Sequence, residues 1–200
     1  LLLPEAVRAA RRPNIVYFMA DDLGSGDVKC FGQEKSRAET PNFDRLASEG
    51  MMFTDAHAVA SVCVPSRVAI MTGRYPWRFD KAERGGPWGF IGLQYQPDTF
   101  TLGDLMRQGG YTTGYVGKWH LGMGDGFHPQ ERGFDYFCGM LGGGHNYFPK
   151  PDTNNLERNG VPLSQFSSPY LTDFFTDEAT GWISKQDEVD DDKPWFMFLS

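Results

Sequence analysis

The chain is organised around one stretch, Ser61-Val-Cys-Val-Pro-Ser-Arg-Val-Ala-Ile-Met-Thr-Gly73. Pro65 is tolerated in the first turn of a helix, where its missing N–H would have no partner, and an apolar run follows from Val68. Backbone N–H groups and the helix dipole favour negative charge at such an N-terminus. The stretch therefore predicts a helix with Cys63 at its N-terminal end.

The local sequence around Cys63 allows two interpretations. A helix N-terminus with Arg67 nearby is the environment that lowers a thiol pKa and produces a nucleophilic thiolate. A lone cysteine is more often a small buried hydrophobic residue. For a cysteine without further motifs, the second interpretation is favoured.

Composition limits the class of protein. The chain has 200 residues, 40% of them hydrophobic, which is enough for one core and predicts one domain. A net charge of −7 argues against nucleic acid as a partner, because phosphate backbones bind basic faces. No apolar run reaches the roughly 18 residues needed to cross a bilayer, so no membrane span is expected.

Residues 1–11 open with Leu1-Leu2-Leu3-Pro4 and continue with alanines. This pattern is typical of the end of a secretion signal and its small-residue cleavage zone. It predicts an exported protein, secreted or periplasmic. The alternative is a frayed apolar terminus.

The run Ile15–Ala20 is short, apolar and rich in β-formers, and predicts a strand buried on both faces. Asp21 and Asp22 follow it, at the strand end where open α/β sheets bind ligands. Adjacent carboxylates repel one another unless a cation neutralises them, and oxygen donors suit Ca²⁺ or Mg²⁺. The pair predicts a metal site; the alternative is a solvated turn.

A second predicted strand, Thr112–Gly117, is followed by Lys118 and His120. We expect both residues on the same rim as Asp21 and Cys63. Lysine offers a point charge for an oxyanion, and histidine exchanges protons near neutral pH. Away from the end of a buried strand, a Lys-x-His pair would be interpreted as ordinary surface residues.

The remaining pattern alternates helices and strands, which predicts an α/β fold with a mostly parallel, largely buried sheet sandwiched by helices. Glycine recurs so often between Leu121 and Asn146 that no regular element is expected there. Asn159-Gly160 predicts a hairpin turn, and Pro162 an edge strand. Further expected elements are a helix after the Thr40 cap ending at Gly50, the helices Leu102–Gln108 and Thr172–Ser184, and the strands Met51–Ala58 and Trp195–Leu199.

Several residues stay open on sequence grounds. Cys30 and Cys138 pair with each other or are two buried thiols. His57 is interpreted as a structural histidine, and the acidic run Asp187–Asp192 as a solvated loop. The aromatic residues between Tyr75 and Pro97 stack on a substrate ring or pack their own loop.

Three motifs together resemble the type I sulfatases, from about Arg12 to residue 200. The first is Cys63-x-Pro-Ser-Arg67 with Thr72-Gly-Arg74, the second is Gly110-Tyr-Thr-Thr-Gly-Tyr-Val-Gly-Lys-Trp-His120, and the third is Asn14-Ile-Val-Tyr-Phe-Met-Ala-Asp-Asp22. The resemblance implies the alkaline-phosphatase-like fold. It also implies that a formylglycine-generating enzyme reads the proline and arginine and oxidises Cys63 to formylglycine.

The resemblance further implies calcium held by Asp21, Asp22 and the modified Cys63. The hydrated aldehyde would attack the sulfur of an aryl or carbohydrate sulfate ester, while Lys118 and Arg67 absorb charge. A base such as His120 would then help to expel sulfate. His145 resembles a family position that contacts the sulfate or its leaving oxygen.

Sulfatases continue well past this length. The resemblance therefore implies that residues 12–200 are the N-terminal part of a catalytic domain, without its smaller C-terminal subdomain and without part of the metal shell. These 200 residues alone are expected to be inactive.

Three other functions fit some of the same residues. A phosphodiester or phosphonate monoester hydrolase would share the whole constellation. A thiol hydrolase would use Cys63 with His120 but leaves the neighbouring proline and arginine without a role. A non-catalytic domain would bind sulfated glycans with Cys63 unmodified.

Overall fold

The computed structural model describes residues 12–32, 36, 38–78, 99–123, 125–150, 155–189 and 192–200. The predicted secretion signal in residues 1–11 lies outside these residues. So do Trp88 and Phe90 of the aromatic stretch, and two aspartates of the acidic run, Asp190 and Asp191.

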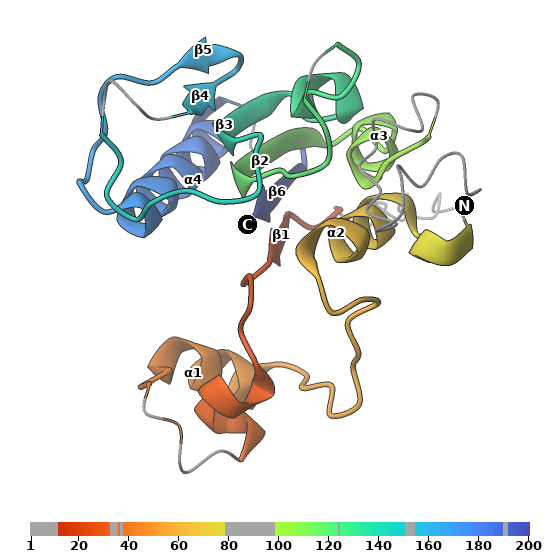
Figure 1. Ribbon diagram of the computed structural model, residues 1–200, viewed down its shortest axis with the longest axis vertical. Coiled ribbons are helices and arrows are strands. Elements are labelled where there is room, and N and C mark those ends of the chain that lie inside the picture. Colours follow the sequence, from red (N-terminus) through yellow and green to blue (C-terminus); the bar gives the residue numbers. More distant parts are fainter. Residues whose placement is uncertain are drawn as a thin grey trace, which may run out of the picture.

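The described residues form one six-stranded sheet with the strand order β1-β6-β2-β3-β4-β5 (Figure 1). The strands β1, β6, β2 and β3 are parallel, and β4 and β5 continue the sheet in antiparallel orientation. This confirms the prediction of an α/β fold with a mostly parallel sheet. The strands are β1 Ile15–Phe18, β2 Thr112–Lys118, β3 Tyr136–Met140, β4 Leu156–Arg158, β5 Val161–Pro162 and β6 Trp195–Leu199.

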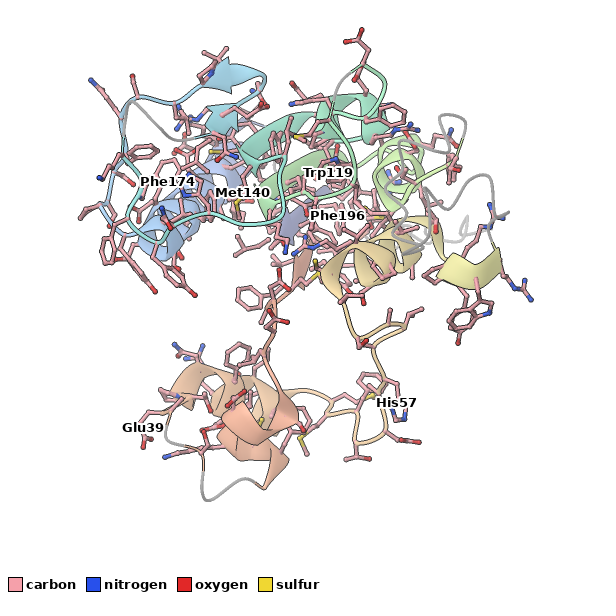
Figure 2. All side chains as sticks on the ribbon, in the orientation of Figure 1. Glu39, His57, Trp119, Met140, Phe174 and Phe196 are labelled. Atoms are coloured by element: carbon pink, nitrogen blue, oxygen red, sulfur yellow. The ribbon has the colours of Figure 1, made fainter. Side chains whose placement is uncertain are left out.

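Helices cover both faces of the sheet, because neighbouring strand residues point to opposite sides. Tyr115 belongs to the core on the side of α2 (Cys63–Thr72) and α3 (Leu102–Gln108), and Val116 to the core beneath α4 (Leu171–Val189). Figure 2 shows the same division between Phe196 on one side and Phe174 on the other. Within the described residues, none of the helices combines the length and hydrophobicity that crossing a bilayer requires.

The segment between β1 and α2 extends away from the sheet and carries α1 (Pro41–Glu49) (Figure 1). Helix α1 was predicted, but it buries no residue, and the Thr40 side chain accepts no capping hydrogen bond from its backbone N–H groups. The predicted strand Met51–Ala58 is wrong: this stretch has no strand partner, and Met51 is 79% exposed. His57 is exposed too and pairs with Asp55 rather than with a core.

Two further predictions are wrong in instructive ways. Strand β1 was expected to be buried on both faces, but it pairs with β6 at the edge of the described sheet, and Phe18 is 57% exposed. The glycine-rich stretch between Leu121 and Asn146 was expected to be irregular but contains β3 and the 3-10 turn η6 (Pro129–Arg132). In β3, a Cβ on Gly139 would lie 1.9 Å from the Gly117 carbonyl oxygen. Glycine here permits close strand approach rather than a turn.

Other local predictions are confirmed. Asn159 and Gly160 adopt φ angles of 52° and 80° and join β4 to β5, as a type I′ hairpin turn requires. Pro162 lies on the outermost strand, where a missing N–H removes no ladder hydrogen bond. Thr101 caps α3 by accepting from the Asp104 N–H at 3.2 Å.

The three cysteines carry free thiols. Cys138 is fully buried in β3, and burial raises the pKa of its thiol to about 12. The sequence left open whether Cys30 and Cys138 pair or are two buried thiols; Cys138 is a buried thiol. Cys30 is half-buried in the 3-10 turn η2 (Lys29–Phe31).

A charged cluster fastens α4 to the antiparallel end of the sheet. Glu178 accepts hydrogen bonds from Nε of Arg158 on β4 at 3.1 Å and from the Tyr136 hydroxyl of β3 at 2.5 Å. Burial acts to raise the pKa of Glu178, but the hydrogen bonds from Arg158 and Tyr136 outweigh it, so this pKa lies below its ordinary value.

This cluster predicts an acid-dependent contribution to stability. Because the pKa of Glu178 is lower in the folded than in the unfolded state, the stabilisation is present above about pH 4.3 and is lost as the pH falls through the folded pKa. Glu178→Gln should therefore lose less free energy of unfolding than the wild type between about pH 6 and about pH 3. Urea denaturation at both pH values measures the difference. Glu188→Gln, at an exposed position of the same helix, should behave as wild type; equal acid sensitivity in Glu178→Gln contradicts the prediction.

Candidate active site

The N-terminus of α2 begins at Cys63, as the sequence predicts. Val62 before it is extended, with φ −134° and ψ 157°, and Pro65 is buried in the first turn. The Ser66 hydroxyl donates to the Ala60 carbonyl at 2.9 Å and fixes the entry of the chain into the helix. Cys63 is half-buried at this end.

Lys118 closes β2, where Gly117 has a φ of 107°. A Cβ at Gly117 would lie 1.9 Å from the Ser200 carbonyl oxygen, so only glycine fits between the ends of β2 and β6. The ammonium of Lys118 lies 2.6 Å from Oδ2 of Asp21, across the end of β6 from β2. The ends of strands far apart in the sequence therefore meet in one ion pair.

Oδ2 of Asp21 also accepts a hydrogen bond from Nη2 of Arg67 at 3.3 Å. Burial acts to raise the pKa of Asp21, but the hydrogen bonds and positive charges of Lys118 and Arg67 outweigh it and hold this pKa below its usual value. Asp21 is therefore a carboxylate at neutral pH. Its charge balances part of the positive charge that Lys118 and Arg67 bring to the strand ends.

Arg67 is 2% exposed and joins three elements. Its Nη1 lies within hydrogen-bonding distance of the Lys118 carbonyl (2.6 Å), the Ser200 hydroxyl (2.8 Å) and the Tyr115 hydroxyl (3.2 Å). Burial raises the pKa of Tyr115 to about 12, so its hydroxyl stays protonated and donates to the Lys118 carbonyl. Because α2 carries both Arg67 and Cys63, this anchoring fixes the helix that presents Cys63.

His120 lies beside Cys63, with 3.4 Å between Nδ1 and Sγ. Its backbone is left-handed, with φ 58°, and its N–H donates to the Leu141 carbonyl at 3.1 Å. Burial and the charges of Lys118 and Arg67 lower the pKa of His120, against a smaller opposing effect of Asp21. The imidazole is therefore neutral at neutral pH and able to accept a proton.

A cavity of about 590 Å³ lies at these strand ends. Five predicted site residues line it: Asp21, Asp22, Arg67, Lys118 and His145. Much of the remaining lining is apolar and includes Phe18, Met140, Tyr147, Leu171 and Phe175. Cys63 and His120 do not line this cavity; they form the adjacent pair. The structure thus brings the predicted residues to one end of the sheet, while their catalytic and binding roles stay predictions.

The residues suit calcium in chemical type but not in number. Asp21 and Asp22 offer carboxylate oxygens, the donors that calcium prefers, but Oδ2 of Asp21 already faces Lys118 and Arg67. Calcium takes about six to eight oxygen ligands. Within the described part of the chain, no group of three or more His, Cys, Asp and Glu residues is placed to hold a metal ion. The two aspartates would supply part of a shell.

Tyr115 and Ser200 were not predicted, although both contact Arg67. Tyr115 had a signal, because a tyrosine within a buried strand needs a partner for its hydroxyl and lies three residues before Lys118. Ser200 had none. Ser200 follows β6, and only the pairing of β6 with β2 brings its hydroxyl close to Arg67.

The geometry predicts coupling between Asp21 and Lys118. A double-mutant cycle with Asp21→Asn and Lys118→Met, measured by urea unfolding in chelator, should give a coupling energy of about 1 kcal/mol or more, because the pair is close and partly desolvated. The exposed pair Arg45–Glu49 serves as control and should couple by about 0.5 kcal/mol or less. Additivity of the Asp21 and Lys118 substitutions within about 0.3 kcal/mol contradicts the prediction.

Comparison with known proteins places this geometry in a family. The sulfatase family model matches residues 13–200. Arylsulfatase H of Canis lupus familiaris is 48% identical over 142 residues, which are 64% of this chain and 25% of the relative. The chain thus spans about a quarter of the length of that arylsulfatase.

Solved structures agree. The crystal structure of Ps i-CgsB in complex with k-i-k-neocarrahexaose has a TM-score of 0.77 and 36% identity, and the match covers 94% of this chain and 44% of that one. BT4656 in complex with its substrate D-glucosamine-2-N,6-O-disulfate has a TM-score of 0.71 and 30% identity, over 94% of this chain and 33% of that one. By sequence and by fold, the chain belongs to the sulfatase family.

Proposed function

We propose that the protein hydrolyses sulfate esters through an oxygen nucleophile derived from Cys63. The observation that carries the proposal is the placement of two pairs at one end of the sheet: Cys63 with His120, and Lys118 with Asp21. Arg67 links them, because it lies one helical turn after Cys63 and contacts Asp21. Membership of the sulfatase family gives this placement its chemical meaning.

The modification of Cys63 is part of the proposal. A formylglycine at this position supplies, when hydrated, the hydroxyl that attacks sulfur. The chain presents Cys63 at the first residue of α2, followed by the proline and arginine that a formylglycine-generating enzyme reads in this family. That enzyme is therefore a proposed partner.

Lys118 and Arg67 bind and orient the anionic sulfate group. Both line the cavity, and Lys118 is 9% exposed, so its charge acts in a largely desolvated setting. Charge that develops on the sulfate oxygens is stabilised more strongly there than in water. Because Arg67 is held by Tyr115, Ser200 and the Lys118 carbonyl, it needs little reorganisation during reaction.

His120 holds and moves a proton. Its Nδ1 faces position 63, and its lowered pKa keeps the imidazole neutral at neutral pH. A neutral imidazole at this distance accepts a proton from a hydroxyl at position 63. His145 lines the same cavity and is proposed to contact the sulfate or its leaving oxygen.

Asp21 and Asp22 would hold a calcium ion, together with the modified residue 63 and further oxygen donors. A calcium ion bound here would supply positive charge that balances the carboxylates and favours ionisation of nearby hydroxyl groups. Asp22 has a left-handed backbone, with φ 59°, which turns the chain directly after Asp21.

The substrate class follows from the cavity and the relatives. A cavity lined by both charged and apolar side chains suits a sulfate group joined to an aryl or sugar ring. The similar structures hold a neocarrahexaose and a glucosamine disulfate, and the similar curated protein is an arylsulfatase. We propose an aryl or carbohydrate sulfate ester, hydrolysed by an exported enzyme.

Matched substrates test the reaction class. The full-length protein should release 4-nitrophenol faster from 4-nitrophenyl sulfate than from a matched 4-nitrophenyl phosphodiester, in the presence of calcium. Chelation should lower the rate, and added calcium should restore it. Faster cleavage of the phosphodiester would assign the site to phosphoryl transfer instead. Binding of a sulfated glycan without any sulfate release would indicate a non-catalytic domain that binds sulfated glycans.

The nucleophile has its own test. After co-expression with a formylglycine-generating enzyme, mass spectrometry of the peptide spanning Cys63 should show the aldehyde in place of the thiol. Cys63→Ala should reduce sulfate release to background, whereas Cys30→Ala, whose thiol lies in the 3-10 turn η2 beside α1, should retain it. Full activity with an unmodified Cys63 thiol, insensitive to chelation, would indicate a thiol hydrolase and contradict the proposal.

A further inference from the structure

The ring of His120 lies against the backbone of Gly143. A Cβ built on Gly143 would lie 2.4 Å from Cε1, 2.5 Å from Nε2 and 3.0 Å from Nδ1 of that ring. Contacts of this length are far inside the van der Waals distance between carbon atoms, which is about 3.5 Å or more. Any side chain at position 143 therefore competes with the His120 ring for the same space.

The backbone of His120 is held in place by its neighbours. The N–H groups of Trp119 and His120 donate to the carbonyls of Met140 and Leu141, at 2.9 and 3.1 Å. Trp119 is fully buried, and its indole N–H donates to the Phe127 carbonyl at 3.0 Å. These bonds fix the His120 backbone relative to Met140 and Leu141. The imidazole rotates about its own side-chain bonds, so we expect it to be the part that moves.

The glycine at 143 is not required by its own backbone. Its φ lies outside the left-handed region, so an L-residue fits the backbone without strain. The neighbouring glycines differ in their surroundings. A Cβ on Gly142 would meet only Nδ2 of Asn155, at an ordinary 3.7 Å, and a Cβ on Gly144 would meet nothing within 4 Å. Of these three consecutive glycines, only Gly143 is required by the His120 ring.

We propose that Gly143 is a positioning residue, whose missing side chain leaves the space in which His120 stays 3.4 Å from Cys63. The inference rests on the proposed function of His120 as the proton acceptor for position 63. A ring pushed aside by a Cβ at 143 rotates about its own side-chain bonds and loses the contact between Nδ1 and position 63. The glycine thus sets the geometry of a proton transfer through the His120 ring, and it also lines the cavity proposed for the substrate.

The kinetic test compares Gly143→Ala, His120→Ala and the double variant in the modified, calcium-loaded protein, with Gly142→Ala as the control. We expect Gly143→Ala to lower kcat for sulfate release by about 10²-fold or more, the size expected when a general base is misplaced, with little change in KM. Gly142→Ala should stay close to wild type. The double variant should be no slower than His120→Ala, because the glycine acts only through the ring.

A wild-type kcat in Gly143→Ala overturns the proposal. So does a double variant whose kcat loss is the product of the two single losses, since that would show an effect of Gly143 independent of His120.

Stability gives a second measurement that does not need an active Gly143→Ala variant. Removing the ring removes the clash, so the melting temperature lost through Gly143→Ala in the wild-type background should be recovered when the same substitution is made on His120→Ala. An equal loss in both backgrounds overturns the proposal, because the clash would then lie elsewhere.

A spectroscopic arm separates this proposal from the proposed function. The sequence has four histidines, so the imidazole resonances of His120 are assignable by comparison with His120→Ala. Without substrate, the His120 resonances of Gly143→Ala should be shifted from their wild-type positions, and those of Gly142→Ala should not. If the full-length protein releases no sulfate, the proposed function fails, while unshifted His120 resonances in Gly143→Ala would overturn the placement of the ring independently.

Discussion

The buried guanidinium of Arg67 is the contact on which the site depends. It connects α2 to the ends of three strands through the Lys118 carbonyl, the Ser200 hydroxyl and the Asp21 carboxylate. A buried charge without partners would cost several kcal/mol, so the position of Arg67 is stable only while those partners are in place. Helix α2, and with it Cys63, is thereby tied to the strand ends rather than only packed on the sheet.

The same constraint explains the electrostatics of the site. Two positive side chains lie close together, and Asp21 is the described carboxylate that faces both. Asp21 balances only part of their charge, which leaves the strand ends suited to an anion. Burial lowers the pKa of His120, and the positive charges of Lys118 and Arg67 lower it further against the smaller opposing effect of Asp21. The positive charge that suits the strand ends to an anion therefore also favours a neutral imidazole.

Much of the fold could be predicted from local patterns, and the failures share a cause. The buried strands β2 and β6 and the helix α4 have patterns that depend on their own residues, and their presence was predicted correctly. The end of α4 was not: the helix continues past Ser184 to Val189, so the first part of the acidic run expected as a loop is helical. The burial of β1 and the strand expected at Met51–Ala58 depend on neighbours that a linear pattern does not reveal. β3 was missed because its glycines resemble turn residues, although Gly139 is required by the approach of Gly117.

The site shows the same limit at the level of single residues. Asp21, Asp22, Cys63, Lys118 and His120 could be selected because their motifs place them at element ends, where parallel strands collect ligand-binding groups. Their exact contacts could not. Asp22 and His120 both adopt left-handed backbones, which residues other than glycine seldom do, and such strain persists only where the surrounding structure holds it. For His120, that surrounding structure includes a hydrogen bond to Leu141 and the open space over Gly143. The glycine-rich stretch after Leu141, which looks irregular in sequence, therefore leaves room for the His120 ring at Gly143. The geometry of the candidate site depends on the side chain that is absent at this position as well as on the side chains that are present.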